Sequence, residues 1–129
     1  MIAKEPNDLT ILLVEDSDDT RYLMRLELEQ CGYKVIEAAD GEKAVELALK
    51  EHPDVILMDL SLPKVDGIAA TRQIREVEVL KKVPIIAITA HHESTFRQDA
   101  AASGFDAYVT KPVDMNFLSE LISGLRFIE

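Results

Sequence analysis

The sequence predicts an α/β fold, a doubly wound five-stranded parallel sheet with helices on both faces. Five short apolar segments alternate with longer amphipathic segments from residue 10 to the end of the chain. Three of the apolar segments, ILLV, VILM and IIAI, contain no polar residue, which is typical of strands covered on both faces. Strands that alternate with helices are joined by right-handed crossovers. We therefore expect a (βα)5 architecture with the flavodoxin-like strand order 2-1-3-4-5.

The expected strands are the short apolar segments themselves. They cover Thr10–Val14, Lys34–Ala38, Val55–Met58, Pro84–Ile88 and Ala107–Val109. The segments between them are expected to be helical, because apolar residues recur there every three or four positions. Asp40 and Asp114 are expected to cap the second and fifth helices. The third helix begins near Asp66, and the fourth covers about residues 94–103.

Two helices have a predicted buried face. In the first helix this face consists of Tyr22, Leu23, Leu26, Leu28 and Cys31, and Gly32 ends the helix. In the fifth helix it consists of Phe117, Leu118, Leu121, Ile122 and Leu125.

Length and composition indicate one domain. The chain has 129 residues, within the usual domain size of about 100–150 residues. We expect residues 1–8 to be an N-terminal lead-in and residues 9–129 to form the domain. Because Met1 and this lead-in precede the domain, we favour a stand-alone protein over a piece of a longer chain.

The charge balance excludes some partners. The formal net charge is −10, so direct binding to nucleic acid is not expected. No apolar segment approaches the roughly 20 residues that span a bilayer, and the N-terminus lacks the apolar stretch of a signal peptide. Cys31 is the single cysteine, which fits a reducing compartment. We expect a cytoplasmic protein without a membrane partner.

Polar residues follow four of the five expected strands. Glu15 and Asp16 follow the first, Asp59 the third, Thr89 the fourth, and Lys111 comes shortly after the fifth. Ligands of open parallel sheets bind beyond the carboxyl ends of the strands, where the strand order reverses. Each residue alone is more simply explained as a helix cap, a strand end or a solvated side chain. Their placement at one edge of one sheet favours a common site.

The expected site suits a divalent cation. Three neighbouring carboxylates repel one another unless a cation lies among them. Mg²⁺ suits best, because it uses one or two carboxylates and completes its shell with water and phosphate oxygens. The ammonium group of Lys111 is expected to lie beside phosphate or beside Asp59 as a positive charge. Thr89 is expected to donate a hydrogen bond from its hydroxyl to a phosphoryl oxygen. Ala90 leaves room for that group.

At these residues the sequence resembles the receiver domains of two-component response regulators, of which the chemotaxis regulator is the simplest. The resemblance covers about residues 9–127. It is carried by LLVEDSDDTR, VILMDLSLPKVDG, IIAITA and YVTKP, in this order and spacing. The resemblance implies that Asp59 is the phosphoacceptor. It also implies that Asp16, Asp59 and the backbone carbonyl of Ser61 ligate Mg²⁺, with Glu15 acting through water.

The resemblance further implies a switch around the phosphoryl group. Thr89 and Lys111 would contact the phosphoryl oxygens beside Ala90, and Tyr108 would occupy the aromatic switch position. The Lys111–Pro112 peptide bond would be cis. The phosphoryl group would come from a phosphohistidine on a sensor histidine kinase or a histidine phosphotransfer protein. Phosphorylation would then alter a surface made by the fourth helix, the fifth strand and the fifth helix, which a downstream protein effector reads.

On this interpretation the chain is not an enzyme but a signalling phosphoacceptor, monomeric or weakly dimeric. Three alternatives stay open. A flavodoxin-like redox protein is disfavoured by the acidic loop at residues 15–19, which would repel a flavin phosphate. A Mg²⁺-dependent phosphohydrolase would need a second acid where Ser61 stands. A receiver that docks to proteins without being phosphorylated is disfavoured by the complete set of site residues.

Overall fold

The chain forms the predicted parallel sheet. The computed structural model describes residues 9–60, 67–89 and 104–125, so the expected fourth helix, Ser61 and Ala90 lie outside the described residues. The strands are β1 (Thr10–Val14), β2 (Lys34–Ala38), β3 (Val55–Asp59), β4 (Ile85–Thr89) and β5 (Ala107–Thr110). All neighbouring strands pair in parallel, and the predicted order 2-1-3-4-5 is confirmed.

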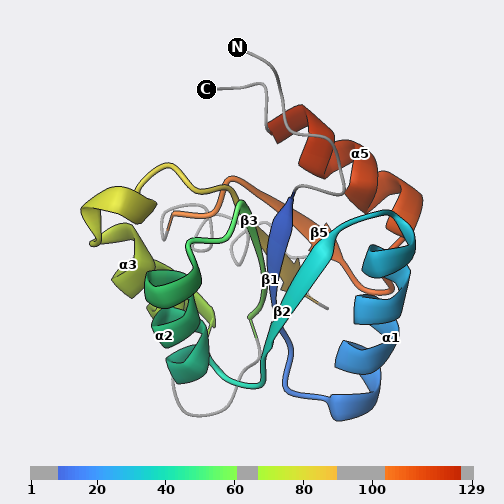
Figure 1. Cartoon of the computed structure of the whole chain (residues 1–129), viewed down its shortest axis with the longest axis horizontal. Coiled ribbons are helices and arrows are strands. Elements are labelled where there is room, and N and C mark those ends of the chain that lie inside the picture. Colours follow the sequence, from blue (N-terminus) through green and yellow to red (C-terminus); the bar gives the residue numbers. More distant parts are fainter. Residues whose placement is uncertain (1–8, 61–66, 90–103, 126–129) are drawn as a thin grey trace.

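Helices cover both faces of this sheet (Figure 1). They are α1 (Asp18–Gln30), α2 (Gly41–Glu51), α3 (Gly67–Arg75), the short 3-10 helix η2 (Glu78–Leu80) and α5 (Met115–Leu125). The sheet separates α1 and α5 from α2 and α3, which gives three layers. In the residues that the structure describes, no helix is long and apolar enough to cross a membrane.

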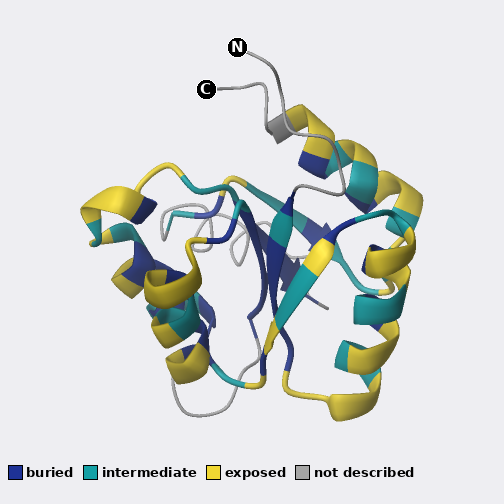
Figure 2. Cartoon of the chain, in the orientation of Figure 1, coloured by how far each residue is buried: buried dark blue, intermediate teal, exposed yellow. Residues whose placement is uncertain are grey.

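The core has two parts because successive residues of a strand point to opposite faces. Ile11 and Leu13 of β1 belong to a buried cluster with α1 and α5, whereas Leu12 and Val14 belong to a cluster with α2 and α3. Every residue of β3 and β4 is buried, and Figure 2 shows the central strands as the most buried part of the chain. The three wholly apolar segments, in β1, β3 and β4, therefore form strands that water does not reach from either face.

Short polar side chains start the helices. The backbone N–H of Thr20 donates to Ser17 Oγ at 3.3 Å, and that of Lys43 donates to Asp40 Oδ1 at 2.8 Å. Asp114 Oδ1 accepts from Asn116 at the start of α5. The predicted caps Asp40 and Asp114 are thus confirmed, and each satisfies N–H groups that have no partner within the helix.

The predicted buried faces of two helices are partly wrong. In α1 the buried residues are Met24 and Leu28, while Tyr22 and Leu23 are 52% and 58% exposed. In α5 Leu118 and Ile122 are buried as predicted, but Phe117 is 52% exposed. Apolar residues cover more of each helix surface than the sheet can bury. The position of the helix on the sheet selects which pair, four residues apart, faces the core.

Arg75 joins three segments at the amino-terminal edge of β4 and β5. Its Nη1 donates to the carbonyl of Val83 at 2.7 Å, and its Nε donates to the carbonyl of Gly104 at 2.9 Å. Its Nη2 pairs with Asp106 Oδ2 at 2.7 Å, and the same carboxylate oxygen accepts from the backbone N–H of Ile85. The end of α3 is thereby fastened to the starts of two strands.

We expect Arg75→Ala to lower the free energy of unfolding by about 2 kcal/mol, because hydrogen bonds from a charged donor contribute about 1.5–3 kcal/mol. Urea unfolding followed by far-ultraviolet circular dichroism measures this change. Arg72→Ala is the matched control, since Arg72 lies one turn earlier in α3 and is exposed. Its effect should stay within about 0.5 kcal/mol. Equal effects of the two substitutions would contradict this role of Arg75.

Candidate functional site

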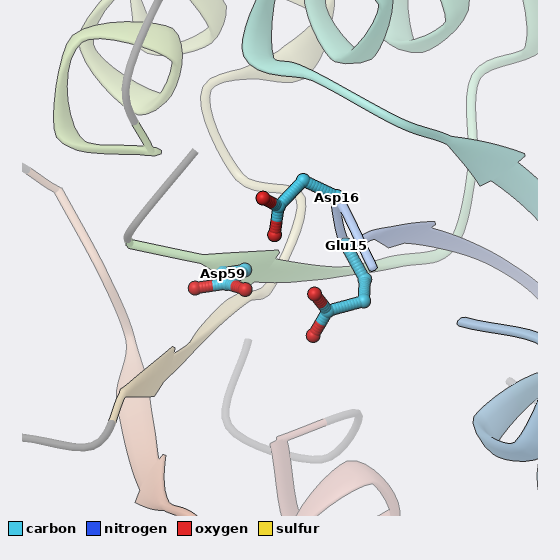
Figure 3. Close-up of side chains that lie close together, drawn as sticks. All are labelled: Glu15, Asp16 and Asp59. Atoms are coloured by element: carbon cyan, nitrogen blue, oxygen red, sulfur yellow. The ribbon is translucent and has the colours of Figure 1, made fainter. Parts of the chain in front are cut away.

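Three carboxylates meet where β1 and β3 end. Glu15 and Asp16 follow β1, and Asp59 is the last residue of β3, one residue later than the sequence predicts for the strand end. Val14 pairs with Met58, so Glu15 and Asp59 leave adjacent strands at the same level. One oxygen from each of the three carboxylates lies within 4.8 Å of the others. Figure 3 shows the three groups close together at this edge of the sheet.

The three acids differ in their exposure. Glu15 is 3% exposed and Asp59 is 2% exposed, whereas Asp16 is exposed to solvent. Burial of two carboxylates side by side costs free energy unless cations or hydrogen bonds compensate their charges. Part of this compensation comes from the protein, because the backbone N–H of Ser17 donates to Glu15 Oε2 at 3.0 Å.

Lys111 supplies the positive charge of the site. Its Nζ lies 3.2 Å from Asp59 Oδ2 and 3.5 Å from Glu15 Oε1. The residue follows β5 directly, and its backbone N–H donates to the carbonyl of Thr89 at 2.8 Å. The Lys111–Pro112 peptide bond is cis. The sequence-based expectation that a lysine from an outer strand reaches Asp59 agrees with this geometry.

The pKa values of two groups follow from this arrangement. Burial, together with the charge of Asp59, raises the pKa of Glu15, although the Ser17 N–H and Lys111 act in the opposite direction. Burial alone would lower the pKa of Lys111, but the charges of Asp59 and Glu15 outweigh it and raise that pKa. Lys111 therefore remains a cation, and the site keeps a fixed positive charge beside Asp59.

Two predicted switch residues lie on the neighbouring strands. Thr89 ends β4 and is 2% exposed, while Tyr108 in β5 is half-buried against the cluster formed with α2 and α3. Tyr108 pairs in register with Ala87, two residues before Thr89. Of the predicted site residues, the structure thus brings Glu15, Asp16, Asp59 and Lys111 together. It places Thr89 at the end of the strand next to Asp59.

Gly67 is a site residue to which the sequence analysis assigned no role. It begins α3, and a Cβ atom at this position would overlap the carbonyl oxygen of Asp59 and lie 2.9 Å from the Cα of Leu60. Both neighbours are backbone atoms, which cannot turn aside. The glycine therefore allows α3 to start directly against the segment that carries Asp59. Gly67 follows Asp66 in the sequence. Because an Asp-Gly pair is a common turn signal, the sequence does not reveal this contact.

The chemistry of the donor set fits a hard divalent cation. Three carboxylates and one ammonium group leave a formal excess of two negative charges when all are ionised. Oxygen ligands of this kind suit Mg²⁺, which retains several waters and binds few protein groups. Asp16, the most exposed of the three acids, lies where solvent can complete such a shell.

Comparison with known proteins establishes the class to which this fold and site belong. The family model of the response regulator receiver domain matches residues 11–123, and the chain belongs to this family. The polar-differentiation response regulator DivK of Brucella ovis is 34% identical over 113 residues, which cover 88% of this chain and 92% of that protein.

Solved structures of receivers agree with the fold. The receiver domain of the sensor histidine kinase PA1611 from Pseudomonas aeruginosa has a TM-score of 0.86 at 37% identity, covering 92% of this chain and 97% of that one. That crystal structure has a magnesium ion coordinated in its active-site cleft. The chemotaxis protein CheY4 of Vibrio cholerae also has a TM-score of 0.86, at 28% identity, covering 91% of this chain and 98% of that one.

We expect Gly67→Ala to lower the free energy of unfolding by about 1–3 kcal/mol, because the added methyl group forces backbone atoms apart. Gly124→Ala is the matched control, since a Cβ at Gly124 meets nothing within 4 Å. That change should raise stability by about 0.5 kcal/mol, because alanine favours the helix over glycine. Chemical denaturation of both variants measures the difference. A Gly67→Ala protein as stable as the wild type would show that the close approach is not required.

Proposed function

We propose that this receiver is a phosphoacceptor in a two-component phosphorelay, with Asp59 as the residue that is phosphorylated. The observation that carries the proposal is the position of the Asp59 carboxylate. It is buried at the end of β3, 3.2 Å from the ammonium group of Lys111 and next to the carboxylates of Glu15 and Asp16. This arrangement offers a nucleophile and a cation together at the edge where parallel sheets bind ligands.

In this proposal Asp16, Asp59 and the backbone carbonyl of Ser61 hold Mg²⁺, and Glu15 acts through a water molecule. The magnesium ion in the PA1611 receiver supports this assignment, as does the excess of negative charge in the present site. When bound, Mg²⁺ supplies positive charge to the oxygens of the transferring phosphoryl group. Glu15 already accepts a hydrogen bond from Ser17 and pairs with Lys111, which suits a role behind the direct ligands.

The chain's own residues then carry the transfer. An Asp59 carboxylate oxygen attacks the phosphorus of a partner phosphohistidine, the P–N bond breaks, and the imidazole leaves with the electron pair. Lys111 remains charged and neutralises a phosphoryl oxygen, and Thr89 donates its hydroxyl to another. The small side chain expected beside Thr89, that of Ala90, would suit the space that this group needs. Attack of water on the acyl phosphate returns Asp59 to a carboxylate and releases inorganic phosphate.

The output is a change of surface rather than turnover of a substrate. The proposed switch includes Tyr108, β5, α5 and the expected fourth helix. A two-state surface biased by the aspartyl phosphate would favour one conformation for a downstream protein effector. The partners upstream are a sensor histidine kinase or a histidine phosphotransfer protein, in the cytoplasm. On this proposal residues 9–129 act as the receiver domain, monomeric or weakly dimeric, and residues 1–8 as a lead-in.

Mg²⁺ binding provides the first test. We expect Asp16→Asn to weaken Mg²⁺ binding at least about tenfold, which corresponds to about 1.4 kcal/mol, because it removes a charged oxygen ligand. Isothermal titration calorimetry measures the dissociation constant. Asp19→Asn removes the same charge from an exposed position in the first turn of α1 and is the matched control. If both variants bind Mg²⁺ equally well, Asp16 is not a ligand.

Phosphorylation provides the second test. Incubation with acetyl phosphate and Mg²⁺, followed by intact-mass spectrometry, should add one phosphoryl group to the wild type. Asp59→Asn should add none, because an amide oxygen is a poor nucleophile at phosphorus, and Asp19→Asn should react as the wild type does. Chelation of Mg²⁺ should abolish the adduct. A wild-type protein that never acquires the adduct would sink the phosphoacceptor proposal and favour a receiver that only docks to other proteins.

A further inference from the structure

Arg21 connects the acidic site to two structural elements. It lies in the first turn of α1, and its side chain is only 17% exposed. Its three nitrogens have three different acceptors. Nη1 donates to the backbone carbonyl of Glu15 at 2.9 Å, Nη2 to Asp18 Oδ1 at 2.6 Å, and Nε to Glu37 Oε1 at 3.3 Å. The guanidinium group thus bridges the β1–α1 loop, the start of α1 and strand β2.

The hydrogen bond from Arg21 to the Glu15 carbonyl affects how the side chains of Glu15 and Asp16 are oriented. That carbonyl belongs to the peptide group between Glu15 and Asp16, so its direction sets how both side chains leave the backbone. The loop is also held on the other side, because the Glu15 N–H donates to the Ala38 carbonyl at 3.1 Å and the Ser17 N–H donates to Glu15 Oε2 at 3.0 Å. A charged hydrogen bond to the carbonyl completes this restraint.

We propose that Arg21 is a positioning residue for the acidic site, which orients Asp16 towards Asp59 by fixing the Glu15–Asp16 peptide group. The proposal rests on the proposed function only where Mg²⁺ is concerned. The three hydrogen bonds of Arg21 go to Glu37, Asp18 and the Glu15 carbonyl, so Arg21 acts on the three carboxylates through the backbone between two of them. Outer residues that orient metal ligands typically change metal affinity about 10- to 100-fold when they are replaced.

A purely electrostatic role of Arg21 and a positioning role predict opposite changes in Mg²⁺ affinity when Arg21 is removed. If Arg21 acts only as a nearby positive charge, its removal makes the site more negative and Mg²⁺ binds more tightly. If Arg21 positions Asp16, its removal weakens Mg²⁺ binding despite the more negative site. Replacement by lysine distinguishes the two roles further, because lysine keeps the positive charge but lacks the planar guanidinium group that reaches three acceptors at once.

Arg25 provides the matched control one turn later in α1. Its Nε pairs with Glu37 Oε2 at 3.4 Å, its Nη1 pairs with Glu29 at 3.7 Å, and its guanidinium lies 5.4 Å from the centre of the Tyr22 ring. Arg25 thus shares Glu37 with Arg21, but its hydrogen-bonding groups point along α1 and towards β2. Arg25→Met removes the same charge and an ion pair with the same glutamate.

The experiment titrates Mg²⁺ into the wild type, Arg21→Lys, Arg21→Met and Arg25→Met by calorimetry. We expect both Arg21 variants to bind Mg²⁺ about tenfold or more weakly. Arg25→Met should bind as tightly as the wild type or more tightly. Equal affinity of Arg21→Met and Arg25→Met, or wild-type affinity of Arg21→Lys, would overturn the proposal. Matching urea midpoints of Arg21→Met and Arg25→Met would show that any difference in affinity is not a loss of stability.

A second measurement tests the positioning role of Arg21 in the absence of Mg²⁺. Hydrogen exchange of the Ser17 amide, which donates to Glu15, reports on the loop in the metal-free protein. This amide should exchange several-fold faster in both Arg21 variants than in Arg25→Met. Unchanged exchange would overturn the positioning role. A wild type that binds no Mg²⁺ would count against the proposed function instead, and the exchange rates would still decide the role of Arg21.

Discussion

The ion pairs of Lys111 with two buried carboxylates are the interaction on which the site depends. Glu15 and Asp59 are almost fully buried, and one ammonium group lies between them at 3.5 and 3.2 Å. Without this cation, the burial of two neighbouring carboxylates would cost more free energy. Lys111 places its positive charge beside both buried groups, while Asp16 stays open to solvent.

Burial of these charged groups costs free energy of folding, and the packing of the surrounding sheet and helices offsets that cost. Four parallel strand pairs and two fully buried strands place the acids at a rigid edge. Buried ion pairs contribute little net stability, because desolvation offsets their attraction. The stability of the chain must therefore come from the two apolar clusters on either face of the sheet. That stability allows the fold to keep the three carboxylates close together, although their charges repel one another.

Contacts to main-chain groups hold the parts of the site in place. Gly67 lets α3 begin against the carbonyl of Asp59, and Arg21 holds the carbonyl of Glu15. The Lys111 N–H bonds to the carbonyl of Thr89, which aligns the end of β5 with that of β4. In each case a main-chain group of a site residue is restrained. Such restraint limits the motion of the neighbouring side chains without occupying the space between them.

The sequence by itself determined the five strands to within one residue at each end, and the neighbouring groups Glu15, Asp16, Asp59 and Lys111, because hydrophobic periodicity and strand ends are local signals. The strand order followed from the topology expected of alternating strands and helices. It did not determine which faces of α1 and α5 are buried, since both carry more apolar residues than the sheet covers. It assigned no role to Gly67 or Arg21, although both lie at the ends of segments that carry the receiver resemblance. Their roles arise from backbone groups of Asp59 and Glu15, which lie eight and six residues away. Only the packing of helices against strand ends brings these groups together, and no spacing of residue types records it.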